Sequence, residues 1–318
     1  MRQPKSNLIL AFFFVSLYSI AVETFLTRYF AVTNWAEYGY WIISMVMAGF
    51  ALSGITLSLF ESFFEKRSRL LISVIPPLLI LFTALGLYWV SINQFNPLEF
   101  QHEVMWKGQL GNIFAYYAAL LPIFFLLGLY IGLVYVINFR EISKIYAVNL
   151  IASAIGSVAI LITMYVVDLF SLMAFIVPLL LVPLYFSITV EDKRIKRAIL
   201  ACGVLFFAGA EIYFVKSGVM TFPFYKPITT PMNSEGNRIL SKKSLPDGYF
   251  LVMENITEFN NIDLSNNYKT LKMGPPPRSL GIYRDGRRVS SLIKTLPTDY
   301  SYLNGALDAF PYKIREKG

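Results

Sequence analysis

Few residues in this sequence could do chemistry, and the first of them lie in an apolar stretch. Glu23 and Arg28 occur near the end of the run from residue 8 to residue 30. An ionisable side chain in hydrocarbon costs at least about 2.5 kcal/mol unless it faces a partner or the protein interior. One hypothesis is a substrate or proton site. The alternative is a snorkelling arginine together with an interhelical or interfacial pair.

Tyr146 and Asn149 form a second polar group, which is followed by several small residues. Asn149 shares a helical face with Ser153, and Gly156 lies close to that face. Small residues let helices approach while an amide hydrogen-bonds across the interface, so structural packing is the alternative to a binding role. Asp168 is interpreted as a solvated helix-end residue and not as a proton relay. The candidate intramembrane polar site consists of Glu23, Arg28, Tyr146 and Asn149.

Histidine and cysteine are almost absent from the chain. The single histidine is His102 and the single cysteine is Cys202. One residue of each kind cannot build a histidine zinc centre, a conventional nucleophile–base triad with other histidines, or a disulfide framework. We therefore predict no catalytic residue, no cofactor-binding residue and no metal ligand.

Long apolar stretches must position the polar residues. Hydrophobic residues occupy 56% of the 318 positions and charged residues only 15%, which is more apolar than a soluble domain. A membrane-spanning helix needs about 20 mostly apolar residues. Seven stretches qualify: 8 to 30, 38 to 60, 70 to 92, 113 to 138, 145 to 167, 171 to 190 and 198 to 216. We expect an α-helical multi-pass membrane bundle of about seven spans over residues 1–218.

Prolines and small residues indicate how these spans pack. One hypothesis is that prolines interrupt their helices, which would free carbonyls and open a cavity. The alternative is that they are ordinary residues of membrane helices, in which proline is common. These prolines are Pro76, Pro77, Pro122, Pro178 and Pro183. Small residues in the second and fourth spans predict close helix packing. They are Gly49, Ser53, Gly54, Gly128 and Gly132.

Basic residues in the short loops predict the orientation. One set of loops holds eleven lysines and arginines, whereas the opposite set holds only Arg28 and Lys107. All four tryptophans lie at or beyond the opposite ends of the spans, as interfacial anchors do. We expect a cell-membrane protein with a cytoplasmic N-terminus, and seven spans would place the tail outside. One span fewer would return the tail to the cytoplasm.

Residues 219–318 have a different composition, richer in glycine, proline, asparagine and charge. Runs rich in β-formers predict strands at Tyr249 to Met253, Asn261 to Leu264, Ser279 to Tyr283 and Val289 to Ile293. Asp285-Gly286 lies between the last two runs and predicts a hairpin. The stretch from Tyr300 to Phe310 predicts a short helix that stops at Pro311. The tail should therefore be a small β-rich extramembrane domain, a β-hairpin with a short C-terminal helix.

Several motifs together resemble membrane-embedded spermidine synthase-like proteins. The run from Tyr146 to Ser157 is similar to that family's motif of a tyrosine, an acid or amide, a leucine and small residues. Pro122 to Gly128 fits as well, as do Glu23 and Arg28 in the first span. Leu280 to Gly286 looks like the strand and Asp-Gly turn that precede the family's catalytic domain. The resemblance covers essentially the whole chain.

The resemblance implies a membrane bundle, a small β domain and a Rossmann-type domain that transfers an aminopropyl group from decarboxylated S-adenosylmethionine to a polyamine. The third part is not found in these residues, because no Gly-x-Gly-x-x-Gly follows a predicted strand and no acidic cluster replaces the family's catalytic aspartates. Soluble members carry a glutamine after the turn and a tyrosine-histidine pair in the next helix. This chain has Val289 and Tyr302-Leu303 there, so only the tyrosine matches.

Two functions remain open from the sequence. The first is a membrane-embedded, non-catalytic portion of a spermidine synthase-like protein that anchors or assembles a catalytic aminopropyltransferase-like domain. A companion Rossmann-type chain or domain would dock on residues 245–312 through Leu280, Ile282 and Val289 or Leu292, and homo-oligomers stay open. The second is a small-molecule transporter or channel subunit that uses the proline-broken helices and Glu23. We expect the chain to lie in a lipid bilayer. The excess of basic residues in the tail is dispersed along the sequence, which predicts no nucleic-acid partner.

Overall fold

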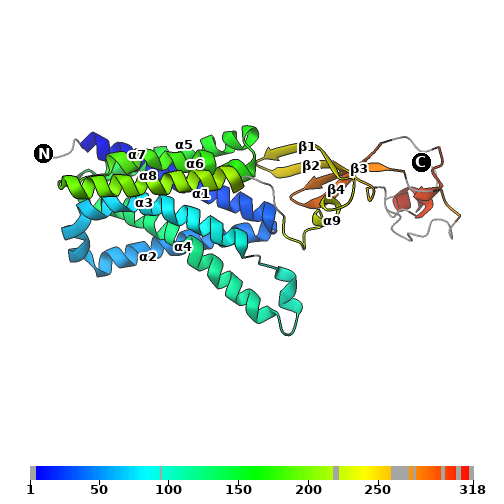
Figure 1. The fold of residues 1–318 in the computed structure, drawn as a ribbon, viewed down its shortest axis with the longest axis horizontal. Helices are drawn as coiled ribbons and strands as arrows, with labels where there is room; N and C mark the ends of the chain where they lie inside the picture. Colours follow the sequence, from blue (N-terminus) through cyan, green and yellow to red (C-terminus); the bar gives the residue numbers. More distant parts are fainter. Residues whose placement is uncertain are drawn as a thin grey trace. The chain divides into compact units, whose positions relative to one another are not determined.

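The chain folds into two compact units, Met1–Pro223 and Phe224–Gly318. A computed structural model describes residues 5–93, 95–217, 222–258, 272–274, 277–294, 298–305 and 309–314. Unit 1 is helical, and unit 2 is built around a small sheet (Figure 1).

Six helices of unit 1 are long and apolar enough to cross a membrane. They are α1 (Lys5–Thr33), α2 (Gly39–Leu59), α3 (Glu61–Ile92), α4 (Trp106–Ile137), α5 (Ile142–Val166) and α8 (Lys193–Ser217). Short 3-10 turns lie between some of them, at η1 (Ala36–Tyr38), η2 (Pro97–Gln101) and η3 (Phe139–Glu141). The six helices coincide with six of the seven expected stretches, and they indicate a membrane-embedded protein.

The seventh expected span, over residues 171 to 190, is not one helix. It consists of η4 (Leu169–Ser171), α6 (Met173–Ile176), η5 (Val177–Leu180) and α7 (Leu181–Phe186). Pro178 lies at the start of η5 and Pro183 lies in α7. Proline has no N–H to donate to the preceding turn, and its ring crowds the carbonyl there. The segment therefore breaks into short turns, and the described residues form six continuous helices of membrane length.

The other expected interruptions are wrong. α3 continues through Pro76 and Pro77, and α4 continues through Pro122. Each proline removes one hydrogen bond from a helix that has 32 residues. Long helices in apolar surroundings tolerate such a loss, because local adjustments and neighbouring groups satisfy the freed carbonyl.

The broken segment, Leu169–Phe186, still runs from one end of unit 1 to the other. At its start, the Phe170 ring lies 6.1 Å from the ring of Tyr29, near the end of α1. Just after its end, the Ser187 carbonyl accepts a hydrogen bond from Ser73 Oγ, near the start of α3, at 3.1 Å. The whole of α2 separates the end of α1 from the start of α3. The two contacts therefore lie at opposite ends of the bundle.

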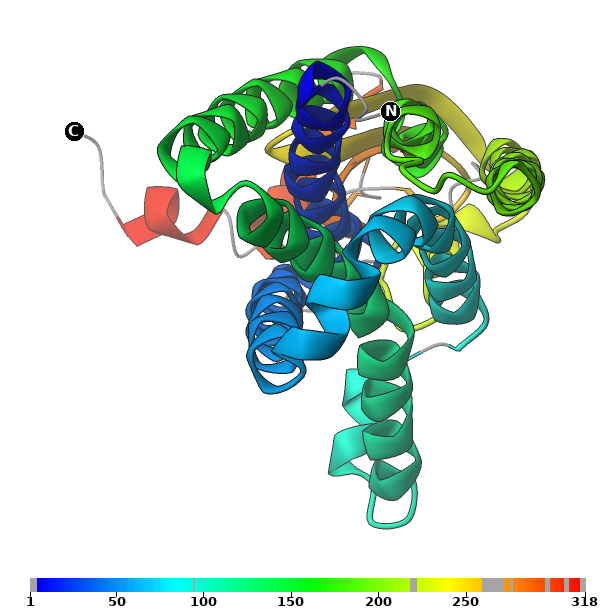
Figure 2. The same ribbon diagram turned by 90° about the vertical axis from the view of Figure 1, so that its left-hand side faces the viewer.

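The two ends of unit 1 differ in chemistry. At the basic end, Arg69 of α3 forms an ion pair with Glu191 at 3.1 Å, close to the basic residues that begin α8. At the aromatic end, the Phe95 ring lies 5.2 Å from Trp41 and 6.4 Å from Tyr116. α1, α3, α5 and α8 run from the basic to the aromatic end, and α3 and α8 lie side by side (Figure 1). Seen nearly end-on, α1 lies against both α5 and α7 (Figure 2).

Glycines allow the closest helix contacts. The positions where a Cβ would lie under 3.0 Å from a neighbouring helix include Gly49, Gly128, Gly132 and Gly156. On Gly128 of α4, that Cβ would lie 2.2 Å from Ser53 Oγ of α2. The predicted close packing is confirmed at these positions. It is wrong at Gly54, where a Cβ would have no neighbour within 4 Å.

Unit 2 contains an antiparallel sheet of order β1-β2-β3-β4. The strands are β1 (Arg238–Leu245), β2 (Gly248–Glu254), β3 (Ser279–Arg284) and β4 (Arg287–Ile293). Short helical segments are α9 (Thr229–Met232), η6 (Ser301–Gly305) and α10 (Phe310–Ile314). One face of the sheet carries the core, since Tyr249, Leu251, Met253 and Tyr283 are buried there.

Three of the predicted strands are confirmed, as β2, β3 and β4. The hairpin is confirmed too, because Asp285 and Gly286 connect β3 to β4 with φ values of 51° and 77°. The predicted strand at Asn261 to Leu264 lies outside the described residues. The helix expected from Tyr300 to Phe310 is found in part, as the 3-10 helix η6 (Ser301–Gly305), and residues 306–308 lie outside the described residues. The expected stop at Pro311 is wrong. Instead α10 begins at Phe310 with Pro311 in its first turn, where an N–H would have no helical partner anyway.

Candidate functional site

The four residues of the candidate intramembrane site do not come together. Gly156 of α5 packs beside Leu17 and Ile20 of α1, and the two helices run parallel. Asn149 lies two turns before Gly156, whereas Glu23 lies about one turn beyond the contact on α1. At 1.5 Å per residue, about 15–20 Å along the bundle separates Asn149 from Glu23. The structure therefore contains two polar groups and no single site.

The Asn149 group joins two helices near the basic end. Asn149 lies close to Tyr135 of α4, and Tyr146 lies close to the same tyrosine. The Tyr135 ring also packs edge-on against Phe12 of α1, at 5.8 Å. Tyr146 itself is 53% exposed. An amide that faces a neighbouring helix beside small residues, such as the closely packed Gly156, is typical of helix packing, so this geometry favours the structural interpretation of Asn149.

Glu23 is half-buried on α1. Within the part of the chain that the structure describes, it forms neither an ion pair with Arg28 nor a hydrogen bond to another side chain. The alternative of an interhelical or interfacial pair therefore finds no support at Glu23, and the substrate or proton hypothesis stays a prediction. Asp168 behaves as expected of a helix-end residue, because its carboxylate accepts a hydrogen bond from the Phe170 N–H at 3.0 Å.

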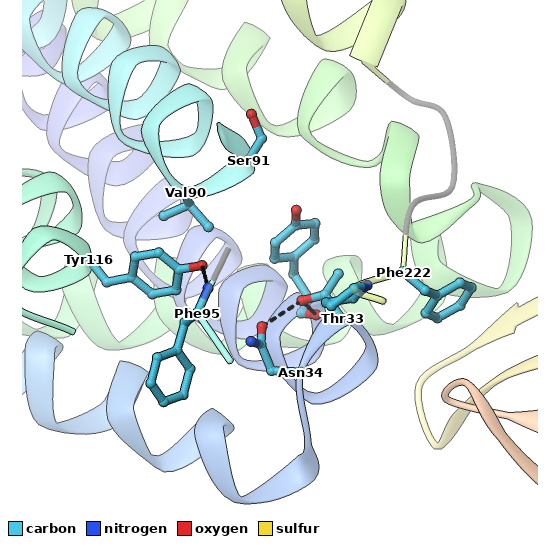
Figure 3. A pocket seen from close by; sticks show the side chains of 9 residues that line it. Thr33, Asn34, Val90, Ser91, Phe95, Tyr116 and Phe222 are labelled. Carbon is cyan, nitrogen blue, oxygen red and sulfur yellow. Dashed lines mark hydrogen bonds between the residues drawn. The ribbon is translucent and has the colours of Figure 1, made fainter. Parts of the chain in front are cut away.

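A small polar cavity lies at the aromatic end of unit 1 (Figure 3). Its volume is about 60 Å³. Its walls come from the end of α1, the end of α3, the start of α4 and the segment that follows α8. The lining residues are Tyr29, Thr33, Asn34, Val90, Ser91, Phe95, Tyr116, Phe222 and Pro223. Such a volume has room for a few water molecules.

Hydrogen bonds hold the walls of this cavity. Thr33 Oγ1 donates to Asn34 Oδ1 at 3.0 Å. The Tyr116 hydroxyl accepts from the Phe95 N–H at 3.2 Å (Figure 3) and also donates to the Asn93 carbonyl. The lining offers neutral hydroxyls and one amide, with no carboxylate and no cation among the described residues. This chemistry can order water or bind a small polar group, but it supplies no general acid or base near neutral pH.

Two further hydroxyl pairs lie inside the bundle. Tyr18 of α1 bonds Thr83 of α3 at 2.6 Å, and Tyr130 of α4 bonds Ser187 at 2.6 Å. All four residues are fully buried or nearly so. The second pair ties the end of the broken segment to α4. These hydroxyls were missed in the sequence, although each is a polar residue inside an apolar run and would have been found by that criterion.

Glu211 on α8 was also missed. One oxygen of its carboxylate is buried and has no hydrogen-bond partner among the described residues. Its signal in the sequence is plain, since it is the only acidic residue in the stretch 198 to 216. It gives unit 1 a second intramembrane carboxyl besides Glu23.

Unit 2 contains a buried carboxylate that is fully engaged. Glu258 is 3% exposed, pairs with Arg288 Nε at 3.1 Å, and accepts a hydrogen bond from the Tyr283 hydroxyl. Burial, followed by the bond to Glu258 and its charge, raises the pKa of Tyr283 above its ordinary value. Tyr302, the one match to the family's tyrosine-histidine pair, is 2% exposed. It is therefore a core residue in this structure.

Comparisons with known proteins give no match: no protein-family model, no curated protein and no solved structure is similar to the chain. The resemblance to spermidine synthase-like proteins stays a prediction from the motifs. Among the described residues, no three histidine, cysteine or acidic side chains gather as a metal site would require.

Proposed function

We propose that the chain is a membrane-embedded, non-catalytic portion of a spermidine synthase-like protein, in which unit 2 assembles a catalytic aminopropyltransferase-like domain. The bundle supplies the anchor. The observation that carries the proposal is an apolar sheet face in unit 2 whose side chains remain partly exposed. The motif order from Tyr146 to Gly286 supports the family assignment.

The outer sheet face consists of Phe250, Val252, Leu280, Ile282 and Leu292. Val252 is opposite Ile282, and Leu280 is opposite Leu292, so these side chains share one face. Leu292 is 53% exposed, and the other four are half-exposed. A contiguous apolar face of this kind marks an interaction surface in a folded protein.

The occupant that fits this face is the predicted companion Rossmann-type domain on residues 245–312. In the family, the small β domain packs against that domain, and Leu280 and Ile282 belong to the strand that carries the resemblance. Val289, also expected in the contact, is 55% exposed at the irregularity between β3 and β4. The face and the side chain of Val289 together offer apolar contacts to a partner.

Affinity isolation of the full-length chain from its native membrane tests the proposal. The wild type and Ile314→Asp, a control outside residues 245–312, should recover a partner with a glycine-rich nucleotide-binding turn. Leu292→Asp should reduce recovery about tenfold, which corresponds to 1.4 kcal/mol of lost contact energy. Isolation of the wild type without such a partner would contradict the proposal.

We also infer that the tail lies outside the cytoplasm. The basic end of unit 1 carries the excess of lysine and arginine that marks a cytoplasmic side. The broken segment supports a seventh crossing of the membrane. With that crossing, the chain returns to the basic end before α8 begins there.

A transporter or channel subunit is the second candidate, favoured by the broken segment and by the carboxyl of Glu23, which has no partner among the described residues. Broken helices in transporters mark substrate sites. Purified chain in vesicles that contain a pH-sensitive dye discriminates between the two functions. The anchor function predicts no proton flux above that of empty vesicles. Flux that is lost in Glu23→Gln and kept in Glu23→Asp would establish the transporter instead.

A further inference from the structure

Four charged residues lie across one end of the sheet in unit 2. Arg238 begins β1, Glu254 ends β2, Arg278 precedes β3 and Lys294 follows β4. Arg238 is the register partner of Glu254, and the Lys294 N–H donates to the Arg278 carbonyl at 3.0 Å. Each of the four strands therefore brings one charged side chain to the same end.

A cavity of about 340 Å³ opens among these side chains. Besides the four charged residues, Asn255 and Ser279 line it. The volume is within the range of small-molecule sites, about 300–1,000 Å³. Ser279 is 2% exposed, and its hydroxyl has no hydrogen-bond partner among the described residues. A buried hydroxyl without a partner is costly unless a ligand or water completes it.

The charges around the cavity do not balance. Glu254 accepts a hydrogen bond from Lys294, which holds the pKa of the carboxyl below its ordinary value, and Arg238 and Arg278 act in the same direction. Three cations thus surround one carboxylate. Glu258, which also lines the cavity, is already paired with Arg288. Two positive charges remain uncompensated, and neither the Arg238 nor the Arg278 guanidinium has a partner within the described ranges.

We propose that this cavity binds a phosphate monoester. A monoester carries about −1.5 to −2 charges near pH 7, which matches the two surplus positive charges, whereas a carboxylate would leave one uncompensated. The guanidinium fork of arginine pairs with two phosphate oxygens at once. No aromatic side chain occurs among the described lining residues, so nothing there would stack on a nucleobase. Glycerol phosphate is therefore a better probe than a nucleotide.

The test uses the purified full-length chain in phosphatidylcholine nanodiscs and titration calorimetry with glycerol 3-phosphate. Wild type should bind saturably and should lose affinity as salt rises, because exposed cations are screened. Arg278→Gln should weaken binding at least tenfold, and Arg278→Lys less. Lys243→Gln removes the same charge from an exposed position of β1 away from the cavity and should bind as the wild type does. Dimethyl phosphate, a singly charged diester, should bind more weakly than glycerol 3-phosphate.

The source of the phosphate is decided by adding phosphatidic acid, a lipid monoester, to the nanodiscs. A lower apparent affinity for glycerol 3-phosphate then identifies a lipid headgroup as the occupant, and an unchanged affinity identifies a soluble monoester. Equal losses of affinity for glycerol 3-phosphate in Arg278→Gln and Lys243→Gln would show that only the overall charge matters, and would overturn the proposal. Non-saturable binding by a wild type with an intact thermal transition would overturn it as well.

Discussion

The hydroxyl of Ser73, near the start of α3, donates a hydrogen bond to the carbonyl of Ser187, which follows the broken segment. Thr189 N–H returns a bond to the same hydroxyl at 2.9 Å. These bonds hold the end of the broken segment at the basic end, whereas Phe170 at its start lies at the aromatic end. The described residues of unit 1 therefore form six long helices and one interrupted segment, and the interrupted segment is the candidate for the proposed seventh crossing.

This path predicts that residues near the start of α3 and residues in unit 2 lie on opposite sides of the membrane. In a Cys202→Ser background, which removes the only cysteine, Lys66→Cys and Lys243→Cys each offer one thiol. A membrane-impermeant maleimide should label only one of the two in sealed, oriented vesicles and both after detergent is added. Labelling of both from the same side would mean that Leu169–Phe186 does not cross.

The contact between α2 and α4 predicts how Gly128 responds to substitution. Gly128→Ala would place a methyl group 2.2 Å from Ser53 Oγ, so we expect a loss of about 1–3 kcal/mol in unfolding free energy. Gly54→Ala meets no neighbouring atom and should not destabilise. Ser53→Ala should partly rescue Gly128→Ala, as a double-mutant cycle would show. Equal stability of the two alanine variants in detergent unfolding would contradict this packing.

The Asp-Gly turn could be predicted from the sequence because its signal is local. Both turn positions need positive φ, and the residue types that tolerate this value are few. β1 was missed for the opposite reason. Its sequence is largely polar, and most of its residues are exposed, so an edge strand of this kind lacks the alternation that identifies a half-buried strand. Lysines are common on exposed edge strands, but they give no alternating apolar pattern by which the strand could be recognised in the sequence.

The candidate site could be predicted only in part, because its geometry depends on contacts between helices. Glu23 and Asn149 were found from their residue types. The distance between them follows from the packing of Gly156 against α1, and this contact between helices cannot be read from a single sequence. The polar cavity was not predicted at all. Asn34, Phe95 and Phe222 come from connecting segments between helices, which have no periodicity to place them.

The hairpin turn gives a second stability prediction. Asp285 adopts φ 51°, and its carboxylate accepts the Tyr249 N–H at 2.8 Å. Asp285→Ala should cost about 1–3 kcal/mol, because alanine tolerates positive φ poorly and leaves a buried N–H without its partner. Asp285→Asn keeps an acceptor oxygen and tolerates this φ, so it should cost clearly less. Hydrogen exchange at β2, β3 and β4 in the full-length chain would report both effects, and the same exchange rates in both variants would refute the assigned role.

The raised pKa of Tyr283 predicts that the folded chain loses stability at alkaline pH. Burial and the bond to Glu258 raise its pKa in the folded state, so the folded chain holds a proton that the unfolded chain releases from about pH 10. Its contribution is complete below that pH and declines as the pH rises further. The thermal transition of the wild type should fall more steeply above pH 10 than that of Tyr283→Phe, which has no proton to release. Parallel pH profiles would show that Tyr283 ionises alike in both states.

The last prediction is that the purified chain alone neither binds nor uses an aminopropyl donor. Decarboxylated S-adenosylmethionine carries positive charge, and the charged cavity of unit 2 has a surplus of cations that would repel it. The cavity at the aromatic end, at about 60 Å³, is far smaller than the roughly 300 Å³ of the smallest ordinary ligand sites. The described residues also contain no glycine-rich turn that would let the backbone approach a nucleoside. Calorimetry and a transfer assay should therefore give no signal for this chain, with a soluble spermidine synthase measured alongside as the positive control. Saturable donor binding would contradict the prediction, because it would require a nucleoside site within this chain.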